Sequence, residues 1–382
     1  MRGHEADGMR VAVAGGSIGG LAAATALRSV GCAVEVYERT PHQMTSRGAG
    51  IVVQPSLTAL LSQVGASSLP TTRCTHRNYL SPHRGSGDLS LMPQRFTSWE
   101  AIYKTLLAAF PAESYHLGAE MAGFNQAGNF SPVSVRLADG RTAEADLLVC
   151  ADGWRSATRT HFLPQASPRY AGYIAWRGTL SESEASADLV SFFDDRFTFS
   201  DARSGGHALC YFIPGDEART VPGQRRLNWV WYVHVPEGSD LDRILTERTG
   251  ERRAGSVSPG LLDDEVAEEM RRAAAHELHP RFAELIAATP EPFVQVILDL
   301  AVPRMRFGRV CLLGDAAFIV RPHTAGATAK AADDARALAL AVKGWRGNLN
   351  DELAHWEANQ LSAGRAMCQY GMALGKRFAS AG

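Results

Sequence analysis

The chain has few cysteines and no long apolar run, and these absences exclude several classes of protein. Its six cysteines are spread over 382 residues, and no two of them form a C-x-x-C pair. This spacing argues against a disulfide framework or a zinc site, and it favours a cytoplasmic, reducing location. No apolar run approaches the length of a membrane span, and the polar start M-R-G-H-E-A-D-G is not expected to act as a signal peptide.

The sequence also lacks an excess of either charge. Lys and Arg together number 39 against 40 for Asp and Glu, the net charge is -1, and the basic residues form no run. We therefore expect neither nucleic acid nor an anionic membrane surface as a partner. The apolar fraction of 45% and the charged fraction of 21% are those of an ordinary globular protein, and the length is that of two domains.

The chain does contain, near its start, a pattern typical of dinucleotide binding. An apolar run from Val11 is followed by a glycine cluster, an alanine-rich helical stretch and a second apolar run that closes on Glu38. In such a strand–helix–strand unit a pyrophosphate lies at the helix N-terminus, and an acidic residue about twenty positions later binds the ribose. This pattern predicts that Gly15, Ser17, Ile18, Gly19 and Glu38 bind the cofactor, and Arg39 and Gly50 are further candidates for cofactor binding.

The same glycine cluster permits a second interpretation. Gly15-Gly16-Ser17-Ile18-Gly19 matches G-x-S-x-G, the strand–turn–helix elbow that carries the nucleophile of α/β-hydrolases. An elbow serine needs earlier strands to supply its oxyanion loop, and only about ten mostly polar residues precede this first strand. Position therefore favours the dinucleotide interpretation. A serine hydrolase at Ser17 and a non-catalytic nucleotide-binding protein are kept as alternatives.

Two later apolar runs end in the same way as the first. One begins at Leu147 and runs into Asp152-Gly153, and the other begins at Val310 and runs into Gly314-Asp315. In an open α/β sheet ligands bind beyond the carboxyl ends of the strands, so three such ends can line one long cofactor. Between Pro164 and Pro292, aromatic residues concentrate in alternating runs that predict antiparallel strands. That segment is expected to form a second domain inserted into the first.

Taken together, the motifs resemble the single-component FAD-dependent aromatic hydroxylases, the para-hydroxybenzoate hydroxylase-like family. They read G-G-S-I-G-G, A-D-G-W-R-S-A-T-R from Ala151 and G-R-V-C-L-L-G-D-A-A from Gly308. Four further stretches narrow the resemblance to the hydroxypyridine hydroxylases of that family: G-I-V-V-Q-P from Gly50, R-F-T-S-W-E-A-I-Y from Arg95, Y-A-G-Y-I-A-W-R-G from Tyr170, and R-P-H with A-K-A-A-D-D-A-R between 321 and 336.

This resemblance implies a fold and a reaction. The expected fold is α/β: a Rossmann-like FAD-binding domain from residues 9–163 and 293–345, an inserted substrate domain with a mixed or antiparallel sheet at 164–292, and C-terminal helices at 346–382. The expected activity uses NAD(P)H and O₂ to hydroxylate an electron-rich hydroxylated aromatic or N-heteroaromatic ring, through a flavin C4a-hydroperoxide. The alternative within enzymes is a flavin tailoring enzyme that performs epoxidation or decarboxylative hydroxylation. A homodimer is the working expectation for the state of association.

The resemblance also assigns roles along the cofactor. It places Glu38 on the adenosine ribose, Asp152-Gly153 where both FAD and the nicotinamide donor bind, and Asp315 on the ribityl chain. It places Pro322 beside the isoalloxazine ring, with Gly326 and Ala327 opening a helix whose positive end faces that ring. The chain departs from the family pattern in three places. Trp99 replaces an arginine, Phe318 replaces a histidine, and the stretch after Pro322 has a single glycine and no asparagine.

The last expectation concerns the substrate. Alternation places His207 and Tyr211 on one face of a strand, and Trp229 and Trp231 on one face of the next strand. The resemblance makes both strands part of the substrate pocket, so we predict His207, Tyr211 and Trp231 to face the substrate. His323, beside Pro322, is the candidate base or hydrogen-bond partner. The alternative for each of these residues is a purely structural place in the protein core.

Overall fold

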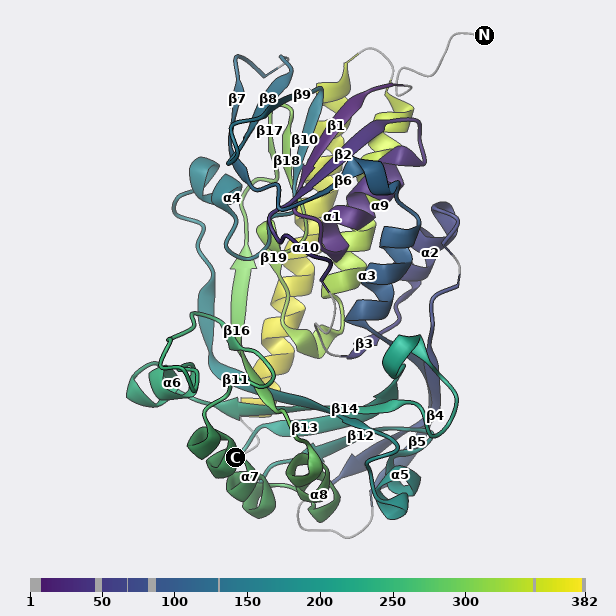
Figure 1. Cartoon of the computed structure of the whole chain (residues 1–382), viewed down its shortest axis with the longest axis vertical. Helices are drawn as coiled ribbons and strands as arrows, with labels where there is room; N and C mark the ends of the chain where they lie inside the picture. Colours follow the sequence, from purple (N-terminus) through teal and green to yellow (C-terminus); the bar gives the residue numbers. More distant parts are fainter. Residues whose placement is uncertain are drawn as a thin grey trace.

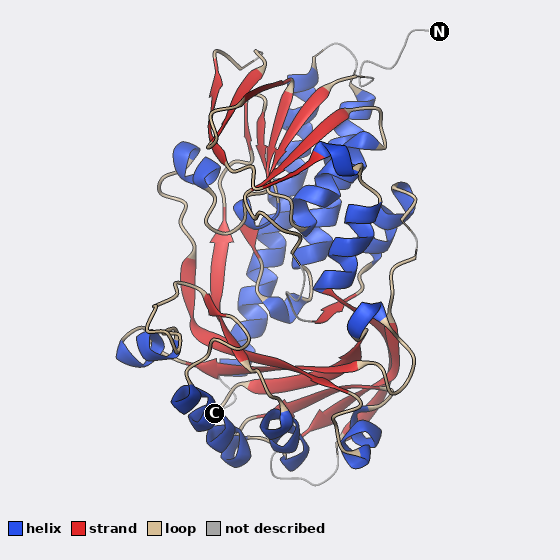
Figure 2. Cartoon of the chain, in the orientation of Figure 1, coloured by secondary structure: helices blue, strands red, loops and turns tan. Residues whose placement is uncertain are grey.

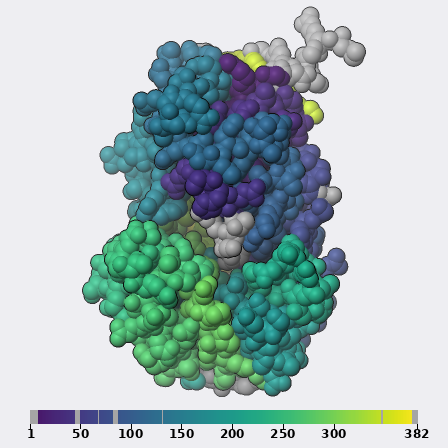
Figure 3. Space-filling view, viewed as in Figure 1, coloured from purple at the N-terminus to yellow at the C-terminus, as the bar shows by residue number. Residues whose placement is uncertain are grey.

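The computed structural model describes residues 8–44, 50–66, 68–81, 87–129, 131–345 and 348–379, with side chains up to residue 376. Two sheets dominate the described chain, a six-stranded sheet in the upper half of Figure 1 and a ten-stranded sheet in the lower half. Helices flank the first sheet, and another group of helices lies beneath the second (Figure 2). The space-filling view shows the surface hollowed between the two halves (Figure 3).

The six-stranded sheet brings together the three apolar runs found in the sequence. All its pairings are parallel except that of the edge strand β17. Each of the three runs is almost wholly buried, as expected of parallel strands covered on both faces. The runs become the neighbours β18, β10 and β1, so their carboxyl ends meet at one edge of the sheet. The strand order is β17 (Arg306–Phe307), β18 (Val310–Leu312), β10 (Leu147–Cys150), β1 (Arg10–Ala14), β2 (Ala33–Glu38) and β6 (Tyr115–Leu117).

Helices from both ends of the chain pack together beside this sheet. The buried alanines of α1 have small side chains, which lets α9 approach closely, and α10 packs against α9 in turn (Figure 1). The chain tail forms one helix, α10, over its described residues. These helices are α1 (Ile18–Arg28), α2 (Pro55–Gln63), α3 (Trp99–Ala108), α9 (Ala327–Gly344) and α10 (Leu349–Ala379).

The ten-stranded sheet is mixed, because β12 and β4 pair in parallel while the other pairings are antiparallel. It draws β3, β4 and β5 from before residue 163, so it extends beyond the 164–292 segment in which the sequence placed it. The strand order is β15 (Ser256–Val257), β16 (Phe293–Ala301), β11 (Arg169–Ser181), β14 (Arg226–His234), β13 (His207–Ile213), β12 (Arg196–Asp201), β4 (Thr72–Leu80), β5 (Asp88–Ser98) and β3 (Gly50–Val52), with β19 (Phe318–Ile319) paired to β16.

The remaining elements complete the two halves. A hairpin that turns around Asp139-Gly140 belongs to a three-stranded sheet. Two helices lie within 264–288, and Pro280 starts the second of them. No helix in the described chain combines the length and the apolar character needed to cross a membrane. These elements are β7 (Met121–Gln126), β8 (Val133–Leu137), β9 (Thr142–Ala145), α4 (Ala157–Phe162), α5 (Ala187–Phe193), α6 (Ser239–Ile244), α7 (Asp264–Glu277) and α8 (Pro280–Ala288), with short 3-10 turns η1 (Ala112–Ser114), η2 (Asp216–Ala218), η3 (Gly314–Ala316) and η4 (Pro322–Thr324).

Candidate active site

The turn between β1 and α1 can be built only from glycine at two positions. Gly15 has a φ of +96°, and a Cβ there would lie 2.4 Å from the carbonyl oxygen of Ala151. A Cβ on Gly20 would lie 1.8 Å from the carbonyl oxygen of Gly15. The turn is therefore tight enough to bring backbone N–H groups to the start of α1, where they can meet a pyrophosphate. Ser17 is the N-cap residue of α1, and its side chain makes no capping hydrogen bond.

Glu38, at the end of β2, lies beside this turn as the sequence predicted for a ribose ligand. Its buried carboxylate accepts hydrogen bonds from the N–H of Gly16 at 2.7 Å and from the N–H of Thr40 at 2.8 Å. The hydroxyl of Tyr115 donates to the carbonyl oxygen of Gly16 at 2.8 Å, so the turn is held from both sides. Arg39 follows with an exposed side chain.

An aromatic column supports the turn where the family pattern has an arginine. Trp99, at the start of α3, stacks on Tyr103 with ring centroids 5.3 Å apart. The hydroxyl of Tyr103 lies 3.2 Å from that of Tyr115, which in turn bonds Gly16. Trp99 is thus connected to the backbone of the turn through Tyr103 and Tyr115. The motif that begins at Arg95 ends on Tyr103 but gave this residue no role, and no quoted motif contained Tyr115. Their connection to Gly16 arises only through the fold.

Each of the other two strand ends carries an acidic side chain suited to a polar ligand. After β10, Asp152 receives a hydrogen bond from the N–H of Thr158 on Oδ2, while its buried Oδ1 has no hydrogen-bond partner within the described chain. After β18, Asp315 reaches solvent, yet the protein around it raises the pKa of its carboxyl to about 6 through desolvation.

The residues at these three strand ends fit FAD. The glycine turn leaves space that a side chain would fill, and Asp152 offers a buried acceptor without a donor in the described chain. Asp315 offers an exposed carboxyl at the end of the neighbouring strand. Because β18, β10 and β1 are adjacent, the three features follow one another along the edge of the sheet. Such a row matches an elongated cofactor with a pyrophosphate and several hydroxyl groups better than it matches a serine nucleophile with its base.

The start of α9 lies next to the short turn that contains Pro322 and His323. Gly326 is the N-cap residue, its N–H bonds the hydroxyl of Thr324 at 3.0 Å, and the helix begins at Ala327. The 18 residues of α9 direct a positive dipole end toward this turn. The connection is made by Ala325, which has a left-handed φ of +50°.

Ala325 gives a simple test of the turn. A left-handed conformation costs a non-glycine residue about 1–2 kcal/mol. Glycine avoids this cost but loses more conformational entropy on folding, which offsets part of the gain. Ala325→Gly is therefore expected to raise the free energy of unfolding by about 0.5–1 kcal/mol. Ala325→Val should lower it. Urea unfolding followed by circular dichroism measures both; equal stability of the three proteins would contradict the left-handed geometry.

The register of the large sheet decides which side chains face the FAD-binding half. His207 pairs with Tyr232, and Tyr211 pairs with Asn228, so these four share one face. Trp231 pairs with Ala208 on the opposite face, where it is 3% exposed and packs against the helices beneath the sheet. The prediction that Trp231 faces the substrate is therefore wrong. Alternation along a strand defines two faces, but only the register with its neighbour shows which face is shared.

His323 and His207 meet on this face, together with two tyrosines that the sequence did not single out. The hydroxyl of Tyr173 lies 2.8 Å from Nε2 of His323. The ring of Tyr232 lies 4.4 Å from the ring of His323, and that of His207 lies 5.3 Å from it. Tyr173 comes from β11, Tyr232 from β14, His207 from β13 and His323 from η4. Four separate segments thus converge beside Pro322.

Burial keeps these groups uncharged at neutral pH. Desolvation lowers the pKa of His207 to about 3 and that of His323 to about 4, with a smaller contribution from His323 and from Arg321 respectively. Desolvation also raises the pKa of Tyr232 to about 12 and that of Tyr173 above its usual value. The cluster therefore presents neutral imidazoles and neutral phenols, which form hydrogen bonds in both directions.

Tyr211 lies on the predicted face, but its ring is held in a packed aromatic group. It is 5% exposed, stacks on Phe96 at 4.3 Å, and meets Phe197 edge-on at 4.9 Å. Gly50 closes over this ring, since a Cβ on Gly50 would lie 2.6 Å from it, and the N–H of Gly50 bonds Asn228 at 2.8 Å. Gly50, the first residue of β3, thus holds the edge of the sheet against Tyr211 and Asn228.

The two faces of the sheet should respond differently to substitution. Trp231→Phe is expected to lower the free energy of unfolding by about 1–3 kcal/mol, because it leaves a cavity in the core, and to leave KM unchanged. Tyr232→Phe retains the packing and removes one hydroxyl, so it should leave stability almost unchanged and raise KM several-fold. Denaturant unfolding and steady-state kinetics on both variants provide the measurement; the reverse pattern would contradict the register.

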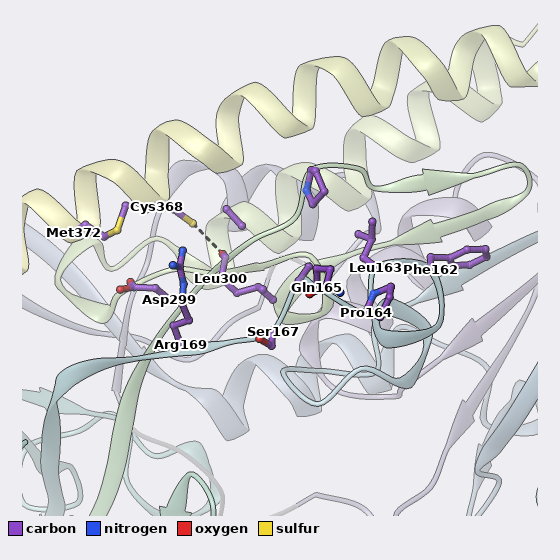
Figure 4. A pocket seen from close by; sticks show the side chains of 13 residues that line it. Phe162, Leu163, Pro164, Gln165, Ser167, Arg169, Asp299, Leu300, Cys368 and Met372 are labelled. Atoms are coloured by element: carbon purple, nitrogen blue, oxygen red, sulfur yellow. Dashed lines mark hydrogen bonds between the residues drawn. The ribbon is translucent and has the colours of Figure 1, made fainter. Parts of the chain in front are cut away.

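A groove of about 640 Å³ lies outside this cluster, between α10, the segment after α4 and the end of β16 (Figure 4). Cys368 and Met372 approach it from α10, and Arg169 and Asp299 approach it from the two strands. None of the residues predicted for the site lines it. Asp299 links it to the cluster, because the same carboxylate binds Arg321.

Comparisons with known proteins agree with this geometry. Residues 170–299 match a family described as FAD binding domain-like. Over 94% of its length the chain is 39% identical to an enzyme of Paenarthrobacter nicotinovorans, 88% of which is covered. The chain therefore belongs to the FAD-dependent aromatic hydroxylases, and it is a monooxygenase with FAD as cofactor and NAD(P)H as co-substrate. That P. nicotinovorans relative is a 2,6-dihydroxypyridine 3-monooxygenase.

Two further matches are enzymes that hydroxylate pyridine rings. The structure of the 2,6-dihydroxypyridine-3-hydroxylase from Arthrobacter nicotinovorans superposes with a TM-score of 0.91 at 37% identity, covering 98% of this chain and 93% of that one. The 6-hydroxynicotinate 3-monooxygenase of Pseudomonas fluorescens is 32% identical over 92% of this chain and 87% of its own length. The expected α/β fold is confirmed, and family membership leaves a hydrolase at Ser17 and a non-catalytic protein without support.

Proposed function

We propose that this enzyme hydroxylates a hydroxylated pyridine ring held against the sheet face that carries His207, Tyr173 and Tyr232. The observation that carries the proposal is the convergence of two neutral imidazoles and two neutral phenols at the turn with Pro322. A hydroxypyridine exchanges between hydroxyl and carbonyl forms, so it needs partners that can both donate and accept hydrogen bonds. Two relatives of this enzyme, from P. nicotinovorans and P. fluorescens, act on 2,6-dihydroxypyridine and 6-hydroxynicotinate respectively.

We assign the cofactor contacts residue by residue from the same geometry. Gly15, Ser17, Ile18 and Gly19 receive the pyrophosphate, and Glu38 and Arg39 receive the adenosine end. Asp152 and Gly153 follow, Asp315 binds the ribityl hydroxyls, and Gly50, Pro322, Gly326 and Ala327 border the ring system. Bound FAD supplies oxygen transfer from O₂ after reduction by NAD(P)H.

The side chains around the ring orient it and keep water away. Tyr173, Tyr232 and His207 form an aromatic wall, and His323 provides the hydrogen-bond partner for a ring oxygen. Arg321 is held by the carboxylate of Asp299, so its charge is already compensated within the protein. Arg321 is therefore not free to pair with a carboxylate on the substrate.

A substrate panel tests the proposed function. Purified holoenzyme is mixed with NADH or NADPH and with hydroxypyridines, phenols and hydroxybenzoates, and oxidation of the reduced nicotinamide is followed together with product mass. We expect hydroxypyridines to accelerate oxidation most and to gain one oxygen atom. Stimulation by benzoates alone, or oxidation that yields only hydrogen peroxide with every hydroxypyridine, would refute the substrate class.

We further propose a cytoplasmic homodimer in which residues 9–163 and 293–345 carry FAD, 164–292 carries the substrate side, and 346–382 packs on the FAD-binding part. All six cysteines are buried and none is joined in a disulfide, which suits a reducing compartment. Light scattering on the purified protein tests the dimer. An apolar set is exposed on the β4–β5 hairpin, where a second copy can bind: Tyr79, Leu89, Leu91 and Met92.

A further inference from the structure

We propose that Tyr173 sets the tautomer and ring orientation of His323, and that Arg321 and Asp299 hold Tyr173 in place for this purpose. The inference rests on the proposed function, in which His323 contacts the ring oxygen of the substrate. Tyr173 is then a positioning residue, because it acts through His323.

The first step is the contact itself. The hydroxyl of Tyr173 lies 2.8 Å from Nε2 of His323, a full-strength hydrogen bond. The two rings are also nearly parallel, with an interplanar angle of 25° and centroids 5.6 Å apart. A hydrogen bond and a stacking contact from one side chain fix both the position and the plane of the imidazole.

The second step is the direction of the proton. Arg321 Nη1 lies 3.5 Å from the hydroxyl oxygen of Tyr173, and a guanidinium group can only donate. The tyrosine oxygen therefore accepts from Arg321, and its single proton goes to Nε2 of His323. Desolvation keeps His323 neutral, so its ring carries a single proton. Because Nε2 accepts the hydrogen bond from Tyr173, that proton must be on Nδ1. His323 is thus set as a donor through Nδ1, and it enters the reaction as a stabiliser of the ring oxygen rather than as its base.

The third step is the anchor that keeps this arrangement rigid. Arg321 forms a two-pronged ion pair with Asp299 of β16, with N···O distances of 2.7 and 2.6 Å. Its guanidinium also lies 5.3 Å from the centroid of the Tyr173 ring. The carboxylate of Asp299 thereby ties the segment carrying His323 to the large sheet, and Tyr173 is held between the two. Among the described residues, the rings of Tyr232 and His207 also lie close to that of His323.

The experiment reads the tautomer directly. Holoenzyme labelled with ¹⁵N in histidine is compared with its His323→Gln variant to assign the His323 ring, whose two nitrogens differ in shift according to protonation. We expect Nδ1 protonated in the wild-type enzyme and a mixture of tautomers in Tyr173→Phe, with kcat/KM lowered about tenfold and FAD content unchanged. Tyr170→Phe is the matched control, since Tyr170 lies on the same strand as Tyr173 and its hydroxyl bonds the carbonyl oxygen of Val235. That variant should keep the wild-type tautomer.

The outcomes separate the two proposals. A protonated Nε2 in the wild-type spectrum overturns the inference without need of any variant. An unchanged tautomer ratio in Tyr173→Phe overturns it as well. If the tautomer behaves as expected but no hydroxypyridine stimulates NAD(P)H oxidation, the role of Tyr173 in orienting His323 stands and the proposed substrate class fails.

Discussion

Gly15→Ala is expected to yield a colourless protein whose Kd for FAD is raised about 100-fold or more, equivalent to about 3 kcal/mol. The new Cβ would meet the backbone oxygen of Ala151 at 2.4 Å, and backbone cannot move aside as a flexible side chain can. The turn would open, and its N–H groups would leave the positions required by the pyrophosphate. Flavin fluorescence titration of the deflavinated protein measures the loss.

A matched control separates this clash from the conformational strain of any positive φ. Gly140 has a φ of +89°, similar to the +96° of Gly15, but a Cβ there would meet nothing within 4 Å. Gly140→Ala should therefore lose about 1–2 kcal/mol of stability and bind FAD normally. If the two variants lose FAD affinity equally, global destabilisation and not the glycine turn is responsible.

His323→Phe is expected to bind FAD and consume NAD(P)H, but to lower the rate of product formation about 100-fold. The substituted ring fills the space and removes the hydrogen bond to the substrate, so reducing equivalents should be lost as hydrogen peroxide. Oxygen consumption and product mass, measured together, give the fraction that is coupled. His276→Phe, at an exposed position on α7, is the control and should remain fully coupled. Normal coupling in His323→Phe would contradict the assignment.

The pH dependence of the wild-type enzyme follows from the same residue. A neutral His323 is required, and its pKa is lowered to about 4 by burial. As the pH falls, the imidazole acquires a proton near pH 4 rather than near its ordinary value of about 6.5. The fraction of NAD(P)H oxidation that is coupled to product formation should therefore fall near pH 4 where His323 becomes protonated. A limb centred near pH 6.5 that disappears in His323→Gln would contradict a buried, neutral imidazole.

Local patterns predicted the cofactor half well. Continuous apolar runs marked β1, β10 and β18, and glycines marked the turn after β1, because burial on both faces and a tight turn leave their signature within a few neighbouring residues. The convergence of their carboxyl ends also followed from a general property of parallel sheets. His323 was predicted as a site residue because it stands next to the proline of a recognisable motif.

The substrate half required information that does not exist within any one segment. Trp231 was assigned to the wrong face, and Tyr232 was missed, because the shared face depends on pairing with β13. Tyr173 and His323 are 150 positions apart in the sequence, and Arg321 and Asp299 are 22 positions apart. The strands β3 to β5 were likewise not expected in the large sheet. Contacts of this kind arise from the folded topology alone.

The order of the six-stranded sheet has a consequence for how the protein is made. Strand β10 lies between β1 and β18, so the edge that receives the cofactor needs residues near 14, 150 and 312 at the same time. On the ribosome the first two strands emerge long before the third, and β10 keeps an unpaired edge during that interval. Pairing across such long separations is slow, and the cofactor has a complete site only after β18 arrives. Flavin uptake should therefore be a late event in biosynthesis, and chains that stop before residue 310 should aggregate rather than bind FAD.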